Sequence, residues 1–376
     1  MRFIEETWSS EKLGNLCKIT MGQSPSSKNY SKNSNDTILI QGNADLISGK
    51  IVPRIYTSEI TKLSYPGDII LTVRAPVGDL AINEFDSCIG RGVCSIKGNK
   101  FIYYYLESLK DKHVWERLSQ GSTFESVNSN DIKNLNLKIP SNSTQNHIIN
   151  FFTAIDTKIE LLQKKHGEYI RFKQYLMQNI FADKSAEKLR FDFDEIRLKS
   201  ISKINKGKQL NKEHMLEIGK FYVLNGGQEP SGYTDSWNTS ENTITISEGG
   251  NSCGFVNFNI EKFWSGGHCY YLNKLSENID VYYLYSYLKF IEPQIMRLRV
   301  GSGLPNIQKG DIENIKIKIL PKKEQIKISN LLLSTDNKIS SIESQKDSFE
   351  IFKKGLLQQM FVVQLILSLL QNKKHI

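Results

Sequence analysis

The second half of this 376-residue chain repeats the first. The segment 121–181 aligns with the segment 301–361 at a constant offset and without a gap. Asp131, Gln145, Asp156, Lys158 and Ile159, for example, recur as Asp311, Gln325, Asp336, Lys338 and Ile339. A unit of this length that occurs only twice is a tandem duplication and not a solenoid, in which short units stack in larger numbers. The chain therefore predicts a monomer with an internal pseudo-two-fold axis.

Upstream of each repeated segment lies a region that differs almost completely between the halves. A few positions still correspond, among them Gly22 and Gly207. Short apolar or alternating runs bounded by turn residues predict strands in both regions. We expect these strands at 36–41, 69–73 and 92–96, and at 221–224, 243–246 and 269–272, with short helices at 103–109 and 281–288. The sequence thus predicts an α+β fold with two tandem mixed α/β domains.

After Pro140 and Pro321 the apolar spacing changes to an alternation of four and three residues, interrupted once in the first segment at Lys173. Proline just before a helix is favourable, and a stripe sustained over about five heptads is typical of a coiled coil. Two helices of about 38 residues would each be about 57 Å long. We expect them to pair antiparallel within one chain, although a core stripe or a seam between two chains would give the same pattern.

The formal net charge of +9 and the isoelectric point near 9.0 favour a polyanionic partner. A solvated basic surface without a partner would have the same composition. A pseudo-two-fold axis also suits a two-part site on duplex DNA. Nucleic acid is therefore the partner that charge and duplication together favour.

Catalytic motifs are not found in the sequence. The glycine-rich segment 249–254 lacks the lysine and hydroxyl residue of a phosphate-binding loop, so a tight turn is the better interpretation. The five cysteines are scattered, none at a Cys-x-x-Cys spacing, and the six histidines do not fall at metal-ligand spacing. The acidic cluster of Asp192, Asp194 and Glu195 suits a solvated linker better than a nuclease site. We expect no metal and no cofactor in this chain.

If the divergent regions read bases, they need side chains that form paired hydrogen bonds, chiefly arginine to guanine and asparagine or glutamine to adenine. We predict DNA contacts by Gln41, Asn43, Arg74 and Arg91 in the first region and by Asn225, Gln228, Tyr233, Asn251 and Ser252 in the second. Neighbouring residues suited to gripping phosphate are Lys28, Tyr30, Lys32, Lys206, Lys208 and Lys212. Arg74 is the strongest of these predictions, because a strand end followed by Pro76 and Gly78 would hold its guanidinium rigidly.

The order of elements resembles the specificity subunit of type I restriction-modification enzymes. The phrases that carry the resemblance are Pro140 to Gln145 with Asp156-Thr157-Lys158-Ile159, and Pro321 to Gln325 with Asp336-Asn337-Lys338-Ile339. The resemblance implies that each variable domain reads one part of a bipartite double-stranded DNA sequence. It also implies that the helices set the gap and dock two modification subunits and, through them, the restriction subunits. S-adenosylmethionine, ATP and magnesium would belong to those partners, and this chain would be a non-catalytic subunit.

On this resemblance we assign residues 1–142 and 184–322 to target-recognition domains, 143–183 and 323–363 to coiled-coil helices, and 364–376 to a hydrophobic tail. The apolar run 361–370 is about half the length needed to span a bilayer, so we expect a continued helix or a packing tail and no membrane contact. The acidic start of the chain does not suit a signal peptide, which predicts a cytoplasmic protein. Two other functions remain open: a coiled-coil adaptor that binds only proteins, and an enzyme with its own nuclease or methyltransferase activity.

Overall fold

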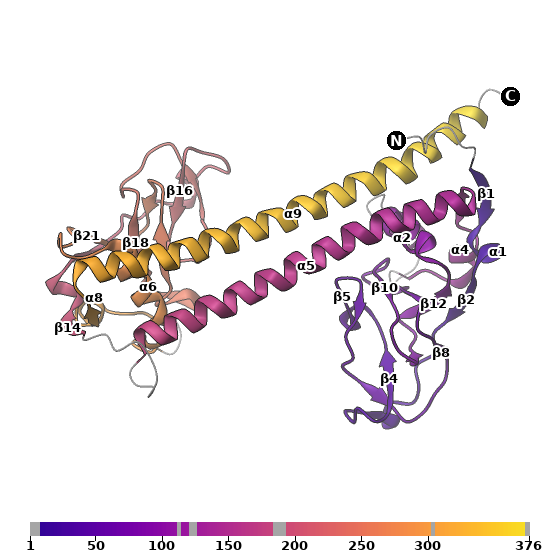
Figure 1. Cartoon of the computed structure of the whole chain (residues 1–376), viewed down its shortest axis with the longest axis horizontal. Helices are drawn as coiled ribbons and strands as arrows, with labels where there is room; N and C mark the ends of the chain where they lie inside the picture. Colours follow the sequence, from indigo (N-terminus) through magenta and orange to yellow (C-terminus); the bar gives the residue numbers. More distant parts are fainter. Residues whose placement is uncertain (1–7, 111–113, 120–125, 183–192, 302–304, 373–376) are drawn as a thin grey trace. The chain divides into compact units, whose positions relative to one another are not determined.

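A computed structural model describes residues 8–110, 114–119, 126–182, 193–301 and 305–372. The chain divides into two compact units, the first formed by residues 1–162 and 345–376 and the second by residues 163–344. Each unit holds one mixed α/β domain together with a part of each long helix (Figure 1). We call the domain of the first unit domain 1 and that of the second unit domain 2.

Domain 1 contains two larger sheets and a two-stranded ribbon. The six-stranded sheet has the order β2 (Lys18–Met21), β12 (Val93–Lys97), β9 (Ile69–Thr72), β10 (Leu80–Ile82), β6 (Lys50–Ile51), β5 (Leu46–Ile47). The five-stranded sheet has the order β3 (Tyr30–Ser31), β7 (Tyr56–Thr57), β4 (Thr37–Ile40), β11 (Ser87–Ile89), β8 (Leu63–Ser64). The ribbon pairs β1 (Ser9–Lys12) with β13 (Asn136–Ile139), and the helices are α1 (Leu13–Leu16), α2 (Lys100–Lys110), α3 (Val114–Ser119) and α4 (Ser129–Lys133).

Domain 2 repeats this plan with fewer strands. Its four-stranded sheet has the order β15 (Lys203–Lys206), β21 (Cys269–Asn273), β18 (Thr243–Ser247), β19 (Val256–Asn259). A three-stranded sheet has the order β17 (Gly232–Thr234), β16 (Phe221–Leu224), β20 (Trp264–Ser265), and β14 (Asp194–Arg197) pairs with β22 (Lys316–Ile319). The helices are α6 (Val281–Phe290), α7 (Glu292–Met296) and α8 (Lys309–Glu313). The strands and short helices expected from the sequence are confirmed, with ends shifted by a few residues.

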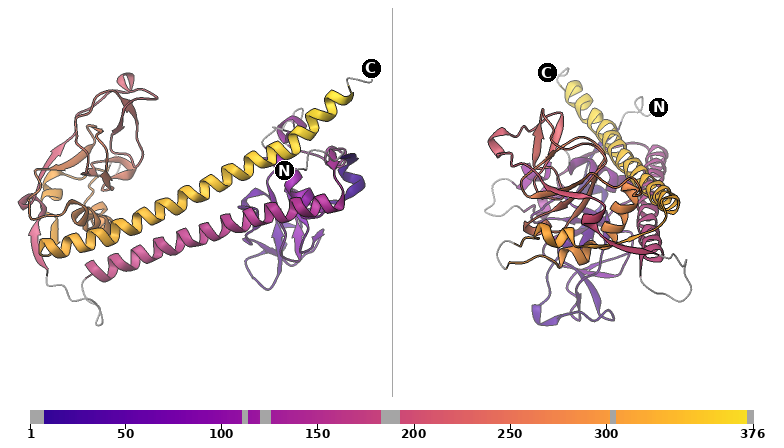
Figure 2. Two further views of the ribbon diagram at one scale, coloured as in Figure 1. Left: turned by 45° about the horizontal axis from the view of Figure 1, so that its top comes forward. Right: turned by 90° about the vertical axis from the view of Figure 1, so that its left-hand side faces the viewer.

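The long helices are α5 (Asn142–Phe181) and α9 (Lys322–Asn372), both beginning shortly after a proline as predicted. In the first unit Ile148 and Phe152, near the start of α5, share a buried core with Leu357 and Phe361 of α9. In the second unit the end of α5 shares a core with Ile328 and Leu332, near the start of α9. The helices are thus antiparallel in both units, as the colours in the left view of Figure 2 show, and the predicted pairing within one chain is confirmed.

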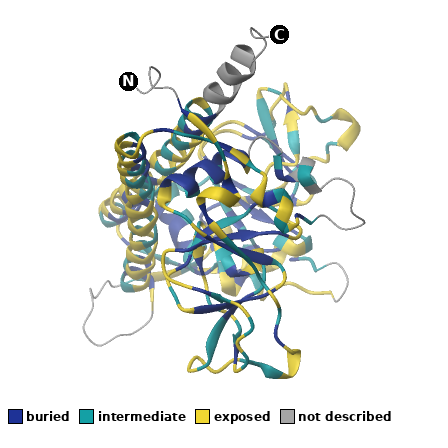
Figure 3. Cartoon of the chain, turned by 90° about the vertical axis from the view of Figure 1, so that its right-hand side faces the viewer, coloured by how far each residue is buried: buried dark blue, intermediate teal, exposed yellow. Residues whose placement is uncertain are grey.

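The two larger apolar cores lie where sheets meet these helices, and a smaller core lies between strands of the two larger sheets of domain 1. Buried residues gather in the strands and on the inner helix faces, and exposed residues follow the outer helix faces and the loop tips (Figure 3). Helix α9 runs through Asn372, so the apolar run after Phe361 continues the helix, which is one of the two outcomes expected.

Ion pairs between the helices form at Lys173, where the apolar seam is interrupted, and at the equivalent Lys353. In the first unit Lys353 Nζ of α9 lies 2.8 Å from Asp156 Oδ1 of α5 and 2.9 Å from Glu107 Oε2 of α2. In the second unit Lys173 Nζ of α5 lies 2.6 Å from Asp336 Oδ1 of α9. The two aspartates are equivalent in the repeat, and so are the two lysines. A charged residue in a coiled-coil seam fixes the register of the helices, which gives the repeated aspartate a physical role.

Replacing Lys353 with alanine is expected to destabilise the first unit by about 2 kcal/mol, because two carboxylates then share a partly buried site without a cation. Burial acts to lower the pKa of Lys353, but Glu107 and Asp156 outweigh it and raise the pKa. Burial raises the pKa of Glu107 despite Lys353, and removing the lysine raises it further. A carboxyl whose pKa is raised in the folded state makes the protein less stable as pH rises. The stability lost in Lys353→Ala should therefore become smaller toward acid pH.

Urea denaturation at several pH values measures this effect. Lys338→Ala, at an exposed position of α9, is the control and should cost less than about 0.5 kcal/mol. A Lys353→Ala deficit that grows toward acid pH would show that the two carboxylates do not control it.

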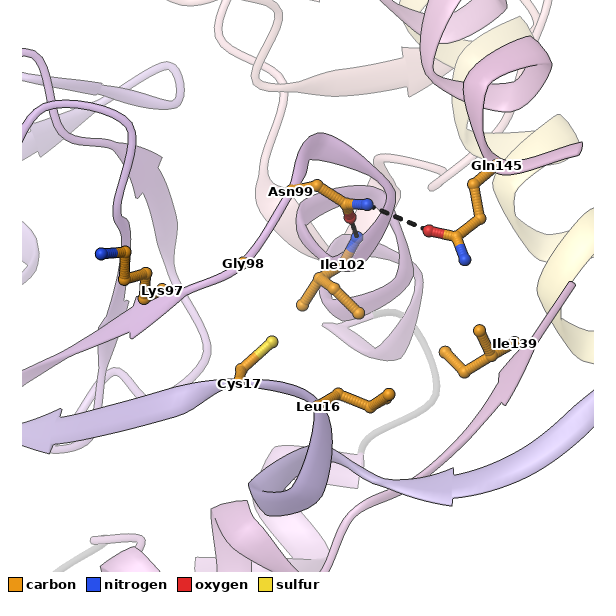
Figure 4. A pocket seen from close by; sticks show the side chains of 8 residues that line it. All are labelled: Leu16, Cys17, Lys97, Gly98, Asn99, Ile102, Ile139 and Gln145. Atoms are coloured by element: carbon orange, nitrogen blue, oxygen red, sulfur yellow. Dashed lines mark hydrogen bonds between the residues drawn. The ribbon is translucent and has the colours of Figure 1, made fainter. Parts of the chain in front are cut away.

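The repeated glutamines attach each long helix to the capping residue of the domain's main helix. Gln145 Oε1 accepts from Asn99 Nδ2 (3.0 Å), while the backbone N–H of Ile102 donates to Asn99 Oδ1 (3.1 Å). These groups line a pocket of about 370 Å³ in domain 1 (Figure 4). In domain 2 Gln325, fully buried, accepts from the backbone N–H of Asp280 (2.8 Å), whose carboxylate caps α6. The repeated glutamine, which follows a proline by five residues in α5 and by four in α9, thus joins each long helix to its domain.

Candidate DNA-recognition surfaces

Three loops of domain 1 meet at Gly92, at the ends of strands β4 and β9. The backbone N–H of Val73 donates to Gly92 O (2.8 Å). On its other side Gly92 is so close to Gln41 that an added Cβ would lie 2.0 Å from Gln41 O. The loops that carry Gln41, Arg74 and Arg91 are therefore adjacent. Arg74 and Arg91 are exposed.

In domain 2 the equivalent loops meet at His268. The backbone N–H of Glu248, directly after β18, donates to His268 O (2.9 Å). Gly226, at a φ of +87°, is so close that an added Cβ would lie 2.6 Å from the same oxygen. Asn225 precedes this glycine as Gln41 precedes Gly42. Equivalent backbone bonds, Gly90 N–H to Ile40 O (2.8 Å) and Gly266 N–H to Leu224 O (2.7 Å), place Gln41 and Asn225 at the same position of the fold.

The retained glycines Gly22 and Gly207 belong to these two surfaces. A Cβ at Gly22 would lie 2.1 Å from Gly90 O, and one at Gly207 would lie 2.2 Å from Gly266 O. Since real Cβ atoms do not come so near a carbonyl oxygen, only glycine lets the strand pass the turn. The weak repeat signal at this position therefore comes from the scaffold that holds the loops.

The remaining predicted residues are divided among several segments. Asn251, exposed, and Ser252, half-buried, lie in the short 3₁₀ turn Gly250–Ser252, which follows Glu248 and so belongs to the group around His268. Gln228 is exposed in the loop after β16, and Tyr233 is 38% exposed in β17, opposite Tyr222. Asn43 is exposed beside Gln41. Gln41 itself is half-buried, and within the described part of the chain its Nε2 has no hydrogen-bond partner.

Of the residues proposed to grip phosphate, Lys206 is already paired. Its Nζ lies 2.6 Å from Glu248 Oε1, which also accepts from the hydroxyl of Tyr270 (2.9 Å). His268 Nδ1 lies 3.5 Å from the other carboxylate oxygen, and Glu248 is only 5% exposed. Domain 1 has Val73 at the position that Glu248 occupies in domain 2. The two surfaces therefore share a backbone arrangement but differ in charge. The other five residues lie exposed or half-buried on loops, short 3₁₀ turns and an edge strand: Lys28, Tyr30, Lys32, Lys208 and Lys212.

The sequence did not predict a second buried carboxylate, Asp45, or the arginine that it binds. Asp45 is 3% exposed; its Oδ2 accepts from the backbone N–H of Gln41 (2.7 Å) and of Gly42 (3.2 Å). Arg54 Nε donates to its Oδ1 (3.0 Å). An acidic residue three positions after Gly42 suits a capped turn, so a signal for Asp45 existed. Its pairing with Arg54 depends on the fold.

A metal ion would need a group of histidine, cysteine or acidic side chains. Within the described residues no group of three or more such side chains could hold one. Glu195 is paired with Lys316 (2.6 Å), and Asp192 lies outside the described residues. All five cysteines are buried and free, and burial raises the pKa of Cys17 to about 11, which makes its thiol unreactive. Helices long and apolar enough to cross a bilayer are likewise absent from the described residues.

Comparisons with known proteins agree on one family. A sequence profile of the type I restriction modification DNA specificity domain matches residues 5–168 and again residues 191–350. A protein of Methanocaldococcus jannaschii, named as the specificity subunit of type I restriction enzyme MjaX, is 36% identical over 191 residues, or 48% of this chain and 44% of that protein. The type I specificity subunit S.MgeORF438P of Mycoplasma genitalium is 26% identical over 271 residues, or 70% of each chain. The alignment thus spans less than half of the first relative.

Solved structures support the fold. The crystal structure of a type I restriction-modification S subunit from M. genitalium matches with a TM-score of 0.71 at 21% identity, over 96% of this chain and 98% of that one. A second match, from a study of complex assembly and conformational transition in a type I system, has a TM-score of 0.56 at 18% identity. The fold predicted from the sequence is confirmed. With its two profile matches and its repeated architecture, this chain belongs to the family of type I restriction-modification DNA specificity subunits.

Proposed function

We propose that this chain is the sequence-specific DNA-binding subunit of a type I restriction-modification complex, and that each domain reads one half of a bipartite target. One observation carries the proposal. The loops that meet at Gly92 and at His268 have the same backbone connections, yet they carry different side chains. Gln41 is matched by Asn225, and the loop of Arg74 by the glycine-rich turn that holds Asn251. A shared scaffold with different base-reading groups suits two unlike half-sites.

The long helices would set the gap between the half-sites and dock the modification subunits. Helix α5 has 40 residues, about 60 Å at 1.5 Å per residue, and its register with α9 is fixed by two ion pairs. Phe172 of α5 and Phe352 of α9 are equivalent in the repeat, and their exposed fractions are 46% and 51%. Exposed aromatic residues are typical anchors of protein interfaces. A pair of them related by the repeat suits two copies of one partner.

The catalytic reactions of the complex would then take place in the partner subunits. We propose that S-adenosylmethionine, ATP and magnesium bind to the modification and restriction subunits, and that the complex acts in the cytoplasm. A coiled-coil adaptor that binds only proteins is not favoured, because it would not need two surfaces with different base-reading groups on one scaffold.

The proposal is tested by selecting from a random duplex library with the purified chain and its modification subunit, at two salt concentrations, and sequencing the retained DNA. We expect two short motifs at one fixed spacing, together with weaker binding at the higher salt concentration, because phosphate contacts release counterions. Salt-sensitive binding without an enriched motif would mean that the chain binds DNA through its positive charge and does not recognise a sequence. Absence of binding would favour the adaptor.

A further inference from the structure

Arg54 is a cationic side chain of domain 1 that a buried acid holds in place. Its side chain is 50% exposed, whereas that of Asp45 is 4% exposed. Among the described residues Arg54 makes one side-chain hydrogen bond, from Nε to Asp45 Oδ1 (3.0 Å). The bond uses the inner nitrogen of the guanidinium, and the two terminal nitrogens are its other donors. Arg54 is thus anchored at its base with its outer donors still available.

The same carboxylate fixes the loop that carries Gln41 and Asn43. Asp45 Oδ2 accepts from the backbone N–H groups of Gln41 and Gly42 at 2.7 Å and 3.2 Å. Arg54 therefore lies beside the loops that meet at Gly92. An unanchored arginine loses rotamer freedom when it binds, at a cost of about 0.5–1.5 kcal/mol for a flexible side chain. Anchoring by Asp45 removes part of that cost before DNA is present.

We propose that Arg54 reads a guanine in the half-site of domain 1, with Asp45 as its positioning residue. This inference rests on the proposed function and names one base that domain 1 would recognise. A planar guanidinium can donate two parallel hydrogen bonds to O6 and N7 of guanine in the major groove, and no other base offers that pair of acceptors. Lysine carries the same charge but lacks the planar fork. A lysine substitution therefore separates base reading from simple attraction to phosphate.

The test applies the library selection to the full chain with its modification subunit, for the wild type and for the variants Arg54→Lys and Arg54→Ala. We expect both variants to lose the preference for one G·C pair in one half-site, by about 5- to 150-fold, while the other half-site is unchanged. Asp45→Asn should weaken the same preference less. Lys12→Ala removes a positive charge from β1 of the same domain and should leave every preference unchanged. Thermal unfolding confirms that each variant is folded.

Two results would overturn the inference alone: an unchanged motif in Arg54→Ala, or an equal loss of affinity for all sequences, which indicates a phosphate contact or a structural role. A wild-type chain that enriches no motif would instead overturn the proposed function and this inference with it. Failure of the inference would thus be seen in the Arg54→Ala variant, and failure of the proposed function would be seen in the wild-type chain.

Discussion

Replacing Phe361 with alanine is expected to lower the free energy of unfolding of the first unit by about 3–5 kcal/mol. Phe361 is fully buried near the end of α9, with its ring centroid 4.9 Å from that of Tyr105, 5.6 Å from Phe101 and 6.1 Å from Trp8. Truncation removes this aromatic contact and leaves a cavity that the surrounding side chains fill only in part. Chemical denaturation followed by tryptophan fluorescence measures the loss, because Trp8 lies in the same cluster.

The repeat supplies a second site for the same experiment. Phe181, equivalent to Phe361, is 1% exposed near the end of α5 and packs against Tyr283 and Tyr287 at 5.6 Å and 5.4 Å. Phe181→Ala should cost as much, in the second unit. Phe172→Ala and Phe352→Ala are the matched controls, since half-exposed rings leave little cavity, and each should cost less than about 1 kcal/mol. Equal losses for buried and exposed phenylalanines would show that the helix ends do not close the two cores.

These paired positions show what the sequence could predict and why. The helices were predictable because periodicity is a local property, and the ungapped match ended at Phe181 and Phe361, the last buried aromatic residues of the two helices. Lys173 was visible only as an interruption of the seam. Its role needs Asp336, which is distant in sequence and comes close only when the helices pair.

Within the divergent regions the sequence predicted strands but not their shared order. The central strands β2-β12-β9-β10 and β15-β21-β18-β19 are equivalent, and so are the parallel pairs β4–β11 and β16–β20. Backbone hydrogen bonds make this order, and they leave little trace in side-chain identity. Gly22 and Gly207 are exceptions, because a carbonyl oxygen excludes any Cβ there.

The predicted base-reading residues stay predictions, and the structure shows only where they lie in the fold. Gln41, Arg74 and Arg91 follow strand ends, where rigid loops were expected, and the structure brings their loops together. Asp45 and Glu248 were missed because a buried acid beside exposed polar residues has the same sequence pattern as a solvated loop. Their burial comes from tertiary contacts with Arg54, Lys206 and Tyr270.

Replacing Phe172 or Phe352 with glutamate is expected to remove one modification subunit from the complex. A charge placed at the centre of an apolar contact is left unpaired when the partner covers it, and loss of an anchor residue typically costs at least about 2 kcal/mol, or about 30-fold in affinity. Because the two positions are equivalent in the repeat, each single variant should retain one modification subunit and the double variant none. Native mass spectrometry of the mixed subunits measures the stoichiometry directly.

Thr157→Glu and Asn337→Glu are the controls, because they introduce the same charge at exposed and equivalent positions of the same helices. Both should leave two modification subunits bound. Each variant should also unfold at the wild-type temperature within a few degrees, since Phe172 and Phe352 are about half exposed. A double variant that still binds two modification subunits would show that the partners dock elsewhere. Loss of both subunits from a single variant would mean that the two sites are coupled and not independent copies of one anchor.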